Sequence, residues 1–164
     1  MSLEKILVPL DGSDLAETAL EAAGDLLLVH PDASLVLVRA AEPSTKPGGD
    51  RAQERGRAIR EAESYLTGVA AGLCRAGVCR VKTSVWYGPA AATIVEAADA
   101  ERVDVIVMTC RGAGSPSRMI LGTVAEAVLR GTRTPILLVR DVGAPVSPPL
   151  GAPVARSSGE ATLA

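Results

Sequence analysis

The chain has 164 residues, which suits one domain, and its net charge of −2 with no long run of Lys or Arg disfavours a nucleic-acid-binding role. Hydrophobic residues make up 48% of the sequence but aromatic residues only 2%, which predicts a core of aliphatic side chains. No apolar stretch has the length of a membrane span, and the first residues lack the apolar run of a signal peptide. We therefore expect a cytoplasmic protein that makes no membrane contact.

Five short runs rich in Val, Ile and Leu alternate with helical segments. The first, fourth and fifth runs are almost continuously apolar, which is typical of parallel strands covered on both faces. Alternation of such strands with helices predicts an α/β fold with one open parallel sheet and helices on both faces. The predicted strands are residues 5–10, 34–41, 80–87, 103–108 and 135–140.

The first two predicted helices cover residues 14–29 and 52–76. Ser13 precedes the first of them and has the side chain of a good N-cap. Apolar residues recur at helical spacing in both segments, so each helix should turn one stripe toward the sheet. The residues expected in these stripes are Leu15, Ala19, Ala22, Leu26 and Val29 in the first helix and Ile59, Ala62, Leu66, Val69 and Leu73 in the second.

Two shorter helices follow in the second half of the chain. Gly88-Pro89 opens the third, with the proline expected in its first turn. The fourth is predicted to begin at Thr123, where the sequence TVAE fits a capping box between Thr123 and Glu126, and to end before Gly131.

Two segments lack any periodic pattern. Residues 43–50 (PSTKPGGD) predict a loop before the second helix. Residues 141–164 are rich in Pro, Gly, Ser and Ala, which predicts a flexible tail after a folded domain of residues 1–140. Alternatively, this tail becomes ordered against a partner chain.

Cysteine and histidine content argues against a disulfide framework and against a metal site of these residues. Cys74, Cys79 and Cys110 are odd in number and include no CxxC pair, which favours reduced thiols in a cytosolic protein. His30 is the only histidine, so a zinc site would lack ligands. We expect His30 to be a surface residue at the end of a helix.

A glycine-containing loop after the fourth strand is the best candidate for an anion site. Thr109-Cys110-Arg111-Gly112 is followed by nine residues and then by Gly122-Thr123, where a helix begins. Backbone N–H groups and the positive end of the helix dipole would then point to one place, and Arg111 and Arg118 could add charge. The alternative is that these glycines only shape the loop and that Thr123 only caps the helix.

At this point the sequence resembles the universal stress protein family, over roughly residues 3–140. The family pattern G-x-x-G-x9-G-[ST] is matched at Gly112, Gly122 and Thr123, whereas Thr109 replaces its first glycine. The segments KILVPLDGS, GPA, ADAERVDVIVM and TPILLVR are also similar and occur in the family's order.

The resemblance implies the fold of the adenine nucleotide alpha-hydrolase-like proteins, a single domain with five parallel strands in the order 3-2-1-4-5. It also implies that ATP, with or without Mg²⁺, binds in a crevice between the first and fourth strands. Asp11 would meet a ribose hydroxyl or the Mg²⁺ ion, although it is also suited to be a helix N-terminal charge beside Ser13. Carried over from the family, the binding residues would be Pro9, Leu10 and Asp11 on the adenosine side, Ala40 against the base, and Met108, Thr109, Arg111, Gly112, Gly122, Thr123 and Val124 around the ribose and phosphates.

The sequence supports two functions of different class. The first is an ATP-binding, nucleotide-sensing stress-response module, with at most slow hydrolysis because the loop has no His, Glu or Asp to orient water. The second is a nucleotide-free interaction protein that acts as a dimer. The resemblance implies a homodimer joined along the edge strand 135–140, and the alternative is that residues after Asp141 cover this edge.

Overall fold

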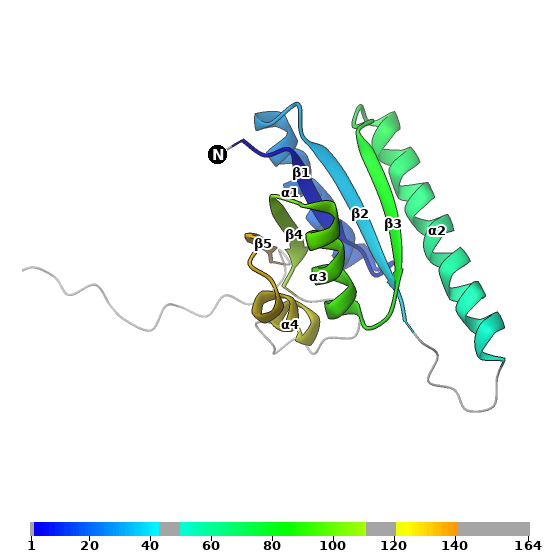
Figure 1. Ribbon diagram of the computed structural model, residues 1–164. Helices are drawn as coiled ribbons and strands as arrows, with labels where there is room; N and C mark the ends of the chain where they lie inside the picture. Colours follow the sequence, from blue (N-terminus) through cyan, green and yellow to red (C-terminus); the bar gives the residue numbers. More distant parts are fainter. Residues whose placement is uncertain (1, 43–49, 111–120, 141–164) are drawn as a thin grey trace, which may run out of the picture.

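The computed structural model describes residues 2–42, 50–110 and 121–140, in which a parallel sheet lies between two layers of helices (Figure 1). The predicted tail 141–164 and most of the predicted loop 43–50 lie outside these residues. No helix in the described part of the chain is both long and apolar enough to cross a membrane. The elements are β1 (Lys5–Pro9), α1 (Asp14–Val29), β2 (Ser34–Ala41), α2 (Arg51–Arg75), β3 (Val81–Tyr87), α3 (Ala90–Glu101), β4 (Val105–Thr109), α4 (Thr123–Gly131) and β5 (Ile136–Val139).

The five strands pair in the order β3-β2-β1-β4-β5, and every neighbouring pair is parallel. This confirms the predicted fold class and strand order. From β1 the chain proceeds outward through β2 to β3, and it then crosses back to β4 on the other side of β1. The order therefore reverses between β1 and β4, which is where open α/β sheets form a crevice at the carboxyl ends of their strands.

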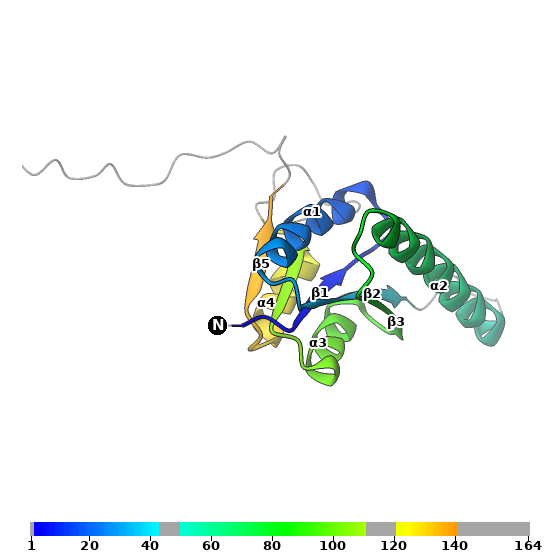
Figure 2. The same cartoon turned by 90° about the horizontal axis from the view of Figure 1, so that it is seen from above.

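The two faces of the sheet have separate aliphatic cores. Ile6 and Val8 of β1 face α1 and α2, whereas Leu7 between them faces α3 and α4 (Figure 2). All three side chains are fully buried, as expected for a central strand covered on both faces. In α2 the predicted stripe is confirmed, with Ala62 and Leu66 buried.

The stripe predicted for α1 is partly wrong. The buried residues of this helix are Ala16, Ala19 and Ala23, so its face of small side chains lies on the sheet. Val29, which was expected to point inward, is 74% exposed. The helix ends in a continuous apolar run, so periodicity alone did not define which side faces the core.

Helix ends and caps differ from the predictions in detail: α2 spans Arg51–Arg75, whereas residues 52–76 were predicted, and α4 begins at Thr123 as predicted. Ser13 caps α1 as expected, since its Oγ accepts from the amide of Ala16 at 3.2 Å. In α3, however, Pro89 is the N-cap itself and not a residue of the first turn. The N-cap of α4 is Gly122, so Thr123 is already helical and the predicted capping box is wrong; the Glu126 carboxylate instead accepts from Arg130 at 2.5 Å. This helix also includes Gly131, one residue beyond its predicted end.

The expectation of reduced cysteines is wrong for two of the three. Cys74 and Cys79 form a disulfide with their Cα atoms 4.3 Å apart, and Cys110 is free. The two residues come together because the chain reverses direction between α2 and β3. His30, by contrast, is the C-cap of α1, which agrees with the expected position at a helix end.

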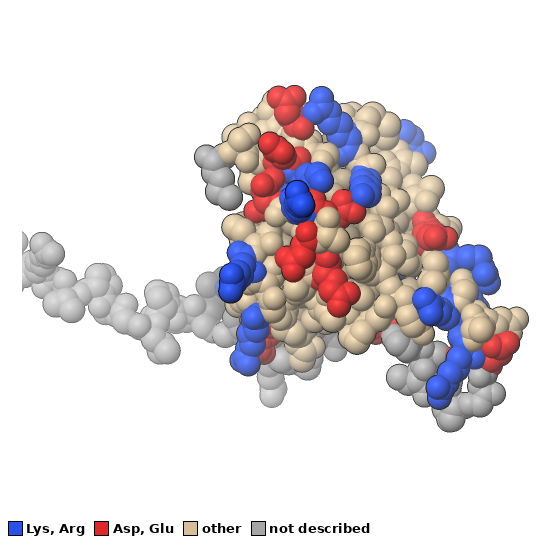
Figure 3. All heavy atoms as spheres, viewed as in Figure 1, with Lys and Arg blue, Asp and Glu red and all other residues tan. Residues whose placement is uncertain are grey.

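Basic side chains gather where α2 begins. Figure 1 shows this end of the helix extending past β3, and Figure 3 shows Lys and Arg side chains over it. The exposed arginines there include Arg51, Arg55 and Arg57. Asp50 caps the helix by accepting from the amides of Ala52 and Gln53, at 3.0 and 3.3 Å.

Candidate functional site

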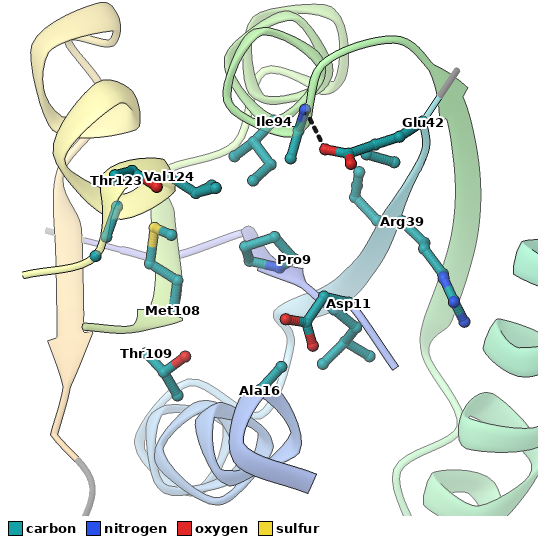
Figure 4. Close-up of a pocket in the computed structure, with 16 residues that line it drawn as sticks. Pro9, Asp11, Ala16, Arg39, Glu42, Ile94, Met108, Thr109, Thr123 and Val124 are labelled. Carbon is teal, nitrogen blue, oxygen red and sulfur yellow. Dashed lines mark hydrogen bonds between the residues drawn. The ribbon is translucent and has the colours of Figure 1, made fainter. Parts of the chain in front are cut away.

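A cavity of about 490 Å³ opens at the carboxyl ends of β1, β2 and β4, where the strand order reverses (Figure 4). The first turns of α3 and α4 form its other walls. Its lining residues are Pro9, Leu10, Asp11, Ala16, Val38, Arg39, Ala40, Glu42, Ala90, Ile94, Met108, Thr109, Gly122, Thr123, Val124 and Ala125.

Nearly all the candidate residues from the sequence meet at this cavity. Arg111 and Gly112 lie outside the described residues, as does Arg118. The residues brought together are Pro9, Leu10, Asp11, Ala40, Met108, Thr109, Gly122, Thr123 and Val124.

The N-terminus of α4 provides the anion-attracting part of the cavity. Its N-cap is Gly122, and no described side chain caps the helix. The first intrahelical bond runs from the amide of Glu126 to the carbonyl of Gly122, so the N–H groups of residues 123–125 come before the helical hydrogen-bond ladder. All three residues line the cavity, so the positive end of the helix dipole is directed toward it.

Thr109 occupies the place of the first glycine in the loop pattern without backbone strain. It is the last residue of β4, pairs with Val139 of β5 and is 7% exposed. Among the described non-glycine residues only Arg102 has a positive φ, so Thr109 does not need the left-handed conformation that favours glycine. The amide of Gly122 donates to the carbonyl of Cys110 at 2.6 Å, so the residue after β4 lies beside the residue before α4.

Most of the chain matches one protein family. The profile of the Universal stress protein family matches residues 2–140. The chain belongs to this family.

Individual relatives agree with this assignment. A universal stress protein of Thermus aquaticus is 34% identical over 143 residues, which cover 82% of this chain and 97% of that protein. The structure of UspA from Lactobacillus plantarum has the same fold, with a TM-score of 0.74 and 22% identity over 85% of this chain and 99% of that one.

Two solved structures of the family contain nucleotides. An Arabidopsis thaliana protein with AMP bound has a TM-score of 0.62 and 14% identity, over 85% of this chain and 93% of that chain. A universal stress protein in complex with cAMP has a TM-score of 0.57 and 22% identity, over 85% and 98% of the two chains. At these identities, the likeness to this universal stress protein is one of fold.

Asp11 has a structural role at the edge of the cavity. Its Oδ1 accepts from the amide of Ser13 at 2.9 Å and from the Ser13 hydroxyl at 2.5 Å. Gly12 between them has φ +87°, which glycine adopts without strain. The carboxylate therefore stabilises the turn into α1, as one of the two readings of the sequence expected, and it also faces the cavity (Figure 4).

Sequence reasoning missed two charged residues of β2 and its end, Arg39 and Glu42. Glu42 Oε1 accepts from the amide of Ala90 at 3.3 Å and so stabilises the start of α3. The Arg39 side chain leaves the cavity in the direction of α2, where its guanidinium lies 4.6 Å from the ring centroid of Tyr65 (Figure 4). Arg39 lies in the last part of the strand predicted to neighbour β1, and Glu42 directly follows it, so strand order together with their charge was a usable signal.

Tyr65 connects Arg39 to α1 behind the Asp11 turn. Its hydroxyl donates to Glu17 Oε1 at 2.6 Å. Burial first, and then the hydrogen bond and the negative charge of Glu17, raise the pKa of Tyr65 above its ordinary value, while Arg39 opposes the shift. The neutral phenol is thus the form that this site favours.

Replacing Tyr65 with phenylalanine should lower the free energy of unfolding at pH 7 by about 1 kcal/mol, because Glu17 loses its partner. Since the pKa of Tyr65 is raised on folding, the unfolded chain releases this proton first, above about pH 10. The contribution of Tyr65 is therefore complete below that pH and decreases above it, so the difference between wild type and Y65F should shrink there. Urea unfolding at several pH values measures this difference. Tyr87→Phe is the matched control, and a difference that grows with pH would contradict the prediction.

Proposed function

We propose that this universal stress protein binds an adenine nucleotide in the cavity, with ATP and Mg²⁺ as the candidate ligands, and responds to nucleotide as a cytoplasmic stress-response module. One observation carries the proposal. The cavity joins an apolar wall, suited to a base, to the N-terminus of α4, which no described side chain caps and which is suited to phosphate, at the reversal point of the sheet.

The apolar wall fits a planar base. Val38 and Ala40 of β2 and Ile94 of α3 line one side of the cavity, and Leu10 follows β1. Ala40 is half-buried and its small side chain leaves room beside the strand. The volume of about 490 Å³ lies in the range of small-molecule sites, about 300–1,000 Å³.

The opposite wall fits a phosphate chain. Residues 123–125 place main-chain N–H groups, and Thr123 a hydroxyl, at the start of α4, where negative charge is stabilised. Asp11 would hold a Mg²⁺ ion together with phosphate oxygens, since Mg²⁺ is usually bound by one or two carboxylates and by the substrate. AMP and cAMP in the two related structures support the choice of an adenine nucleotide.

We infer that the nucleotide acts as a bound effector and not as the substrate of a dedicated enzyme. Among the described residues two carboxylates line the cavity, and each has a hydrogen-bonding role in the fold: Asp11 at the Ser13 turn and Glu42 at the start of α3. Neither is therefore positioned chiefly to activate water.

A homodimer through β5 is the second proposal, and a nucleotide-free dimer is the alternative function. β5 is an edge strand of the sheet, and Leu137 on it is 40% exposed. An apolar edge with unpaired backbone groups favours pairing with a second copy. Light scattering should give the mass of two chains at micromolar concentration, and the mass of one chain would overturn the dimer.

Mass spectrometry of small molecules released from the purified protein, followed by titration with Mg-ATP, AMP and cAMP, tests the nucleotide proposal. Gly122→Val should weaken ATP binding about tenfold or more, because the branched side chain enters the phosphate end of the cavity. Gly122 has an ordinary φ of −74°, so valine there does not strain the backbone.

Gly68→Val in α2 is the matched control, since a side chain there meets open space. It should bind nucleotide as the wild type does. No released nucleotide and no titration heat with the wild type would overturn the nucleotide proposal and leave the dimeric interaction protein.

A further inference from the structure

The disulfide between Cys74 and Cys79 lies at the opposite end of the sheet from the cavity. Cys74 is in the last turn of α2 and Cys79 comes shortly before β3 begins at Val81. Both cysteines are exposed, whereas Cys110 after β4 is half-buried. The pair is therefore accessible to reagents in solution and is separated from the nucleotide site.

Backbone hydrogen bonds hold this turn without help from the sulfur atoms. The amide of Val78 donates to the carbonyl of Leu73 at 2.9 Å, and the amide of Gly77 donates to the carbonyl of Cys74 at 3.0 Å. With Gly77 at φ +98°, these bonds form a Schellman motif, the usual way in which a helix ends on a left-handed glycine. Val78 and Leu73 also pack against the core under α2.

The residues after Cys79 are anchored independently as well. The carbonyl of Arg80 accepts from the amide of Leu35 at 2.9 Å, and Arg80 Nη1 donates to the carbonyl of Asp32 at 2.8 Å. The two cysteines are thus brought together by the α2 cap on one side and by β2 on the other. Opening the disulfide leaves these contacts in place, and its short loop constrains the unfolded chain less than a longer loop would.

We propose that Cys74 and Cys79 form a reversible thiol–disulfide exchange site for low-molecular-weight thiols. A thiolate RS⁻ attacks one sulfur, the S–S bond breaks, and the other cysteine leaves as a thiolate that takes up a proton. A second RS⁻ attacks the thiol-derived sulfur of the mixed disulfide, which releases RSSR and frees the first cysteine. Two RSH are oxidised to RSSR while the protein disulfide is reduced to two thiols, and the reverse reaction restores it.

Equilibration of the full chain with glutathione and glutathione disulfide at varied ratios tests this proposal. After acid quenching and alkylation, mass spectrometry should find Cys74 and Cys79 labelled together in reducing mixtures and protected together in oxidising ones. The labelled fraction should depend on the glutathione ratio in the same way whether the protein starts oxidised or reduced. Circular dichroism should show a folded protein throughout. A pair that stays oxidised in excess reduced glutathione until the protein unfolds, or that glutathione disulfide cannot oxidise, would overturn the proposal.

Three variants make the test specific to this turn. C74S should accumulate a glutathione adduct on Cys79, whereas the wild type should not, because Cys74 displaces it; C110S should titrate as the wild type does. Gly77→Ala adds a methyl group that meets nothing within 4 Å but penalises the left-handed turn. Because the turn is formed in both redox states, this variant should destabilise the folded protein and leave its thiol–disulfide equilibrium with glutathione unchanged. A persistent adduct on the wild type would show that the two sulfurs do not meet.

Discussion

Replacing Leu66 with alanine is expected to lower the free energy of unfolding by about 2–5 kcal/mol. Leu66 is fully buried in the core between α2 and the sheet, in the same cluster as Ile6 and Leu35. In α2 only Ala62 and Leu66 are fully buried, while Tyr65, Val69, Ala70 and Leu73 pack against the same core from partly buried positions. Leu66 is therefore the largest fully buried side chain that holds this helix to the sheet. Its truncation leaves a cavity that the strands beneath cannot fill, because their side chains are already closely packed.

Leu28→Ala provides the matched control, since it makes the same change on a helix at a side chain that is 83% exposed. Its free energy of unfolding should stay within about 0.5 kcal/mol of the wild type. Urea denaturation of both variants measures the two effects, and the slopes of the free energy of unfolding against urea concentration should be compared. Equal losses in the two variants would show that α2 is not held by Leu66.

The prediction of the fold succeeded where the sequence pattern reflects burial alone. The apolar runs around Leu7 and Ile106 predicted central strands, and both residues are fully buried. The strand order came from the family resemblance, because runs of this kind do not say which strands are neighbours. The buried faces of helices were harder to predict than the strands. The run that ends in Leu28 and Val29 is apolar on every side, yet these two residues are solvent-exposed.

Errors at single positions have a common physical origin in turn geometry. Gly122 and Thr123 are both acceptable N-caps, so composition could not decide which of them caps α4. The pairing of Cys74 with Cys79 depends on the left-handed conformation of Gly77, which reverses the chain after α2. A glycine close behind a predicted helix was the one available signal for this reversal.

The candidate site was predicted best where a residue ends a strand or begins a helix within the family pattern. Pro9, Thr109 and Thr123 are of this kind, and all three line the cavity. Arg39 and Glu42 were missed because they belong to no motif. Their position at the cavity follows from the pairing of β2 with β1, which is a property of the assembled sheet.

Replacing Ala40 with leucine is expected to weaken adenine nucleotide binding about 10- to 100-fold, if the base lies against β2 as proposed. Ala40 is half-buried and lines the cavity on the same face of β2 as Val38. The larger side chain would extend into the cavity, so the fold should persist while the space for the base is lost. Ala100→Leu, at an exposed position of α3, is the matched control and should leave both affinity and stability unchanged. Calorimetric titration with Mg-ATP and AMP measures the effect.

Comparison of Ala40→Leu with Gly122→Val separates the two ends of the ligand. The base is common to adenosine, AMP and ATP, so A40L should weaken all three by a similar factor. Gly122 lies at the start of α4, where the phosphates are proposed to bind, so G122V should weaken ATP more than adenosine. If G122V weakens adenosine as much as ATP while A40L has no effect, the base and not the phosphate chain lies at α4, and the proposed orientation of the nucleotide is reversed.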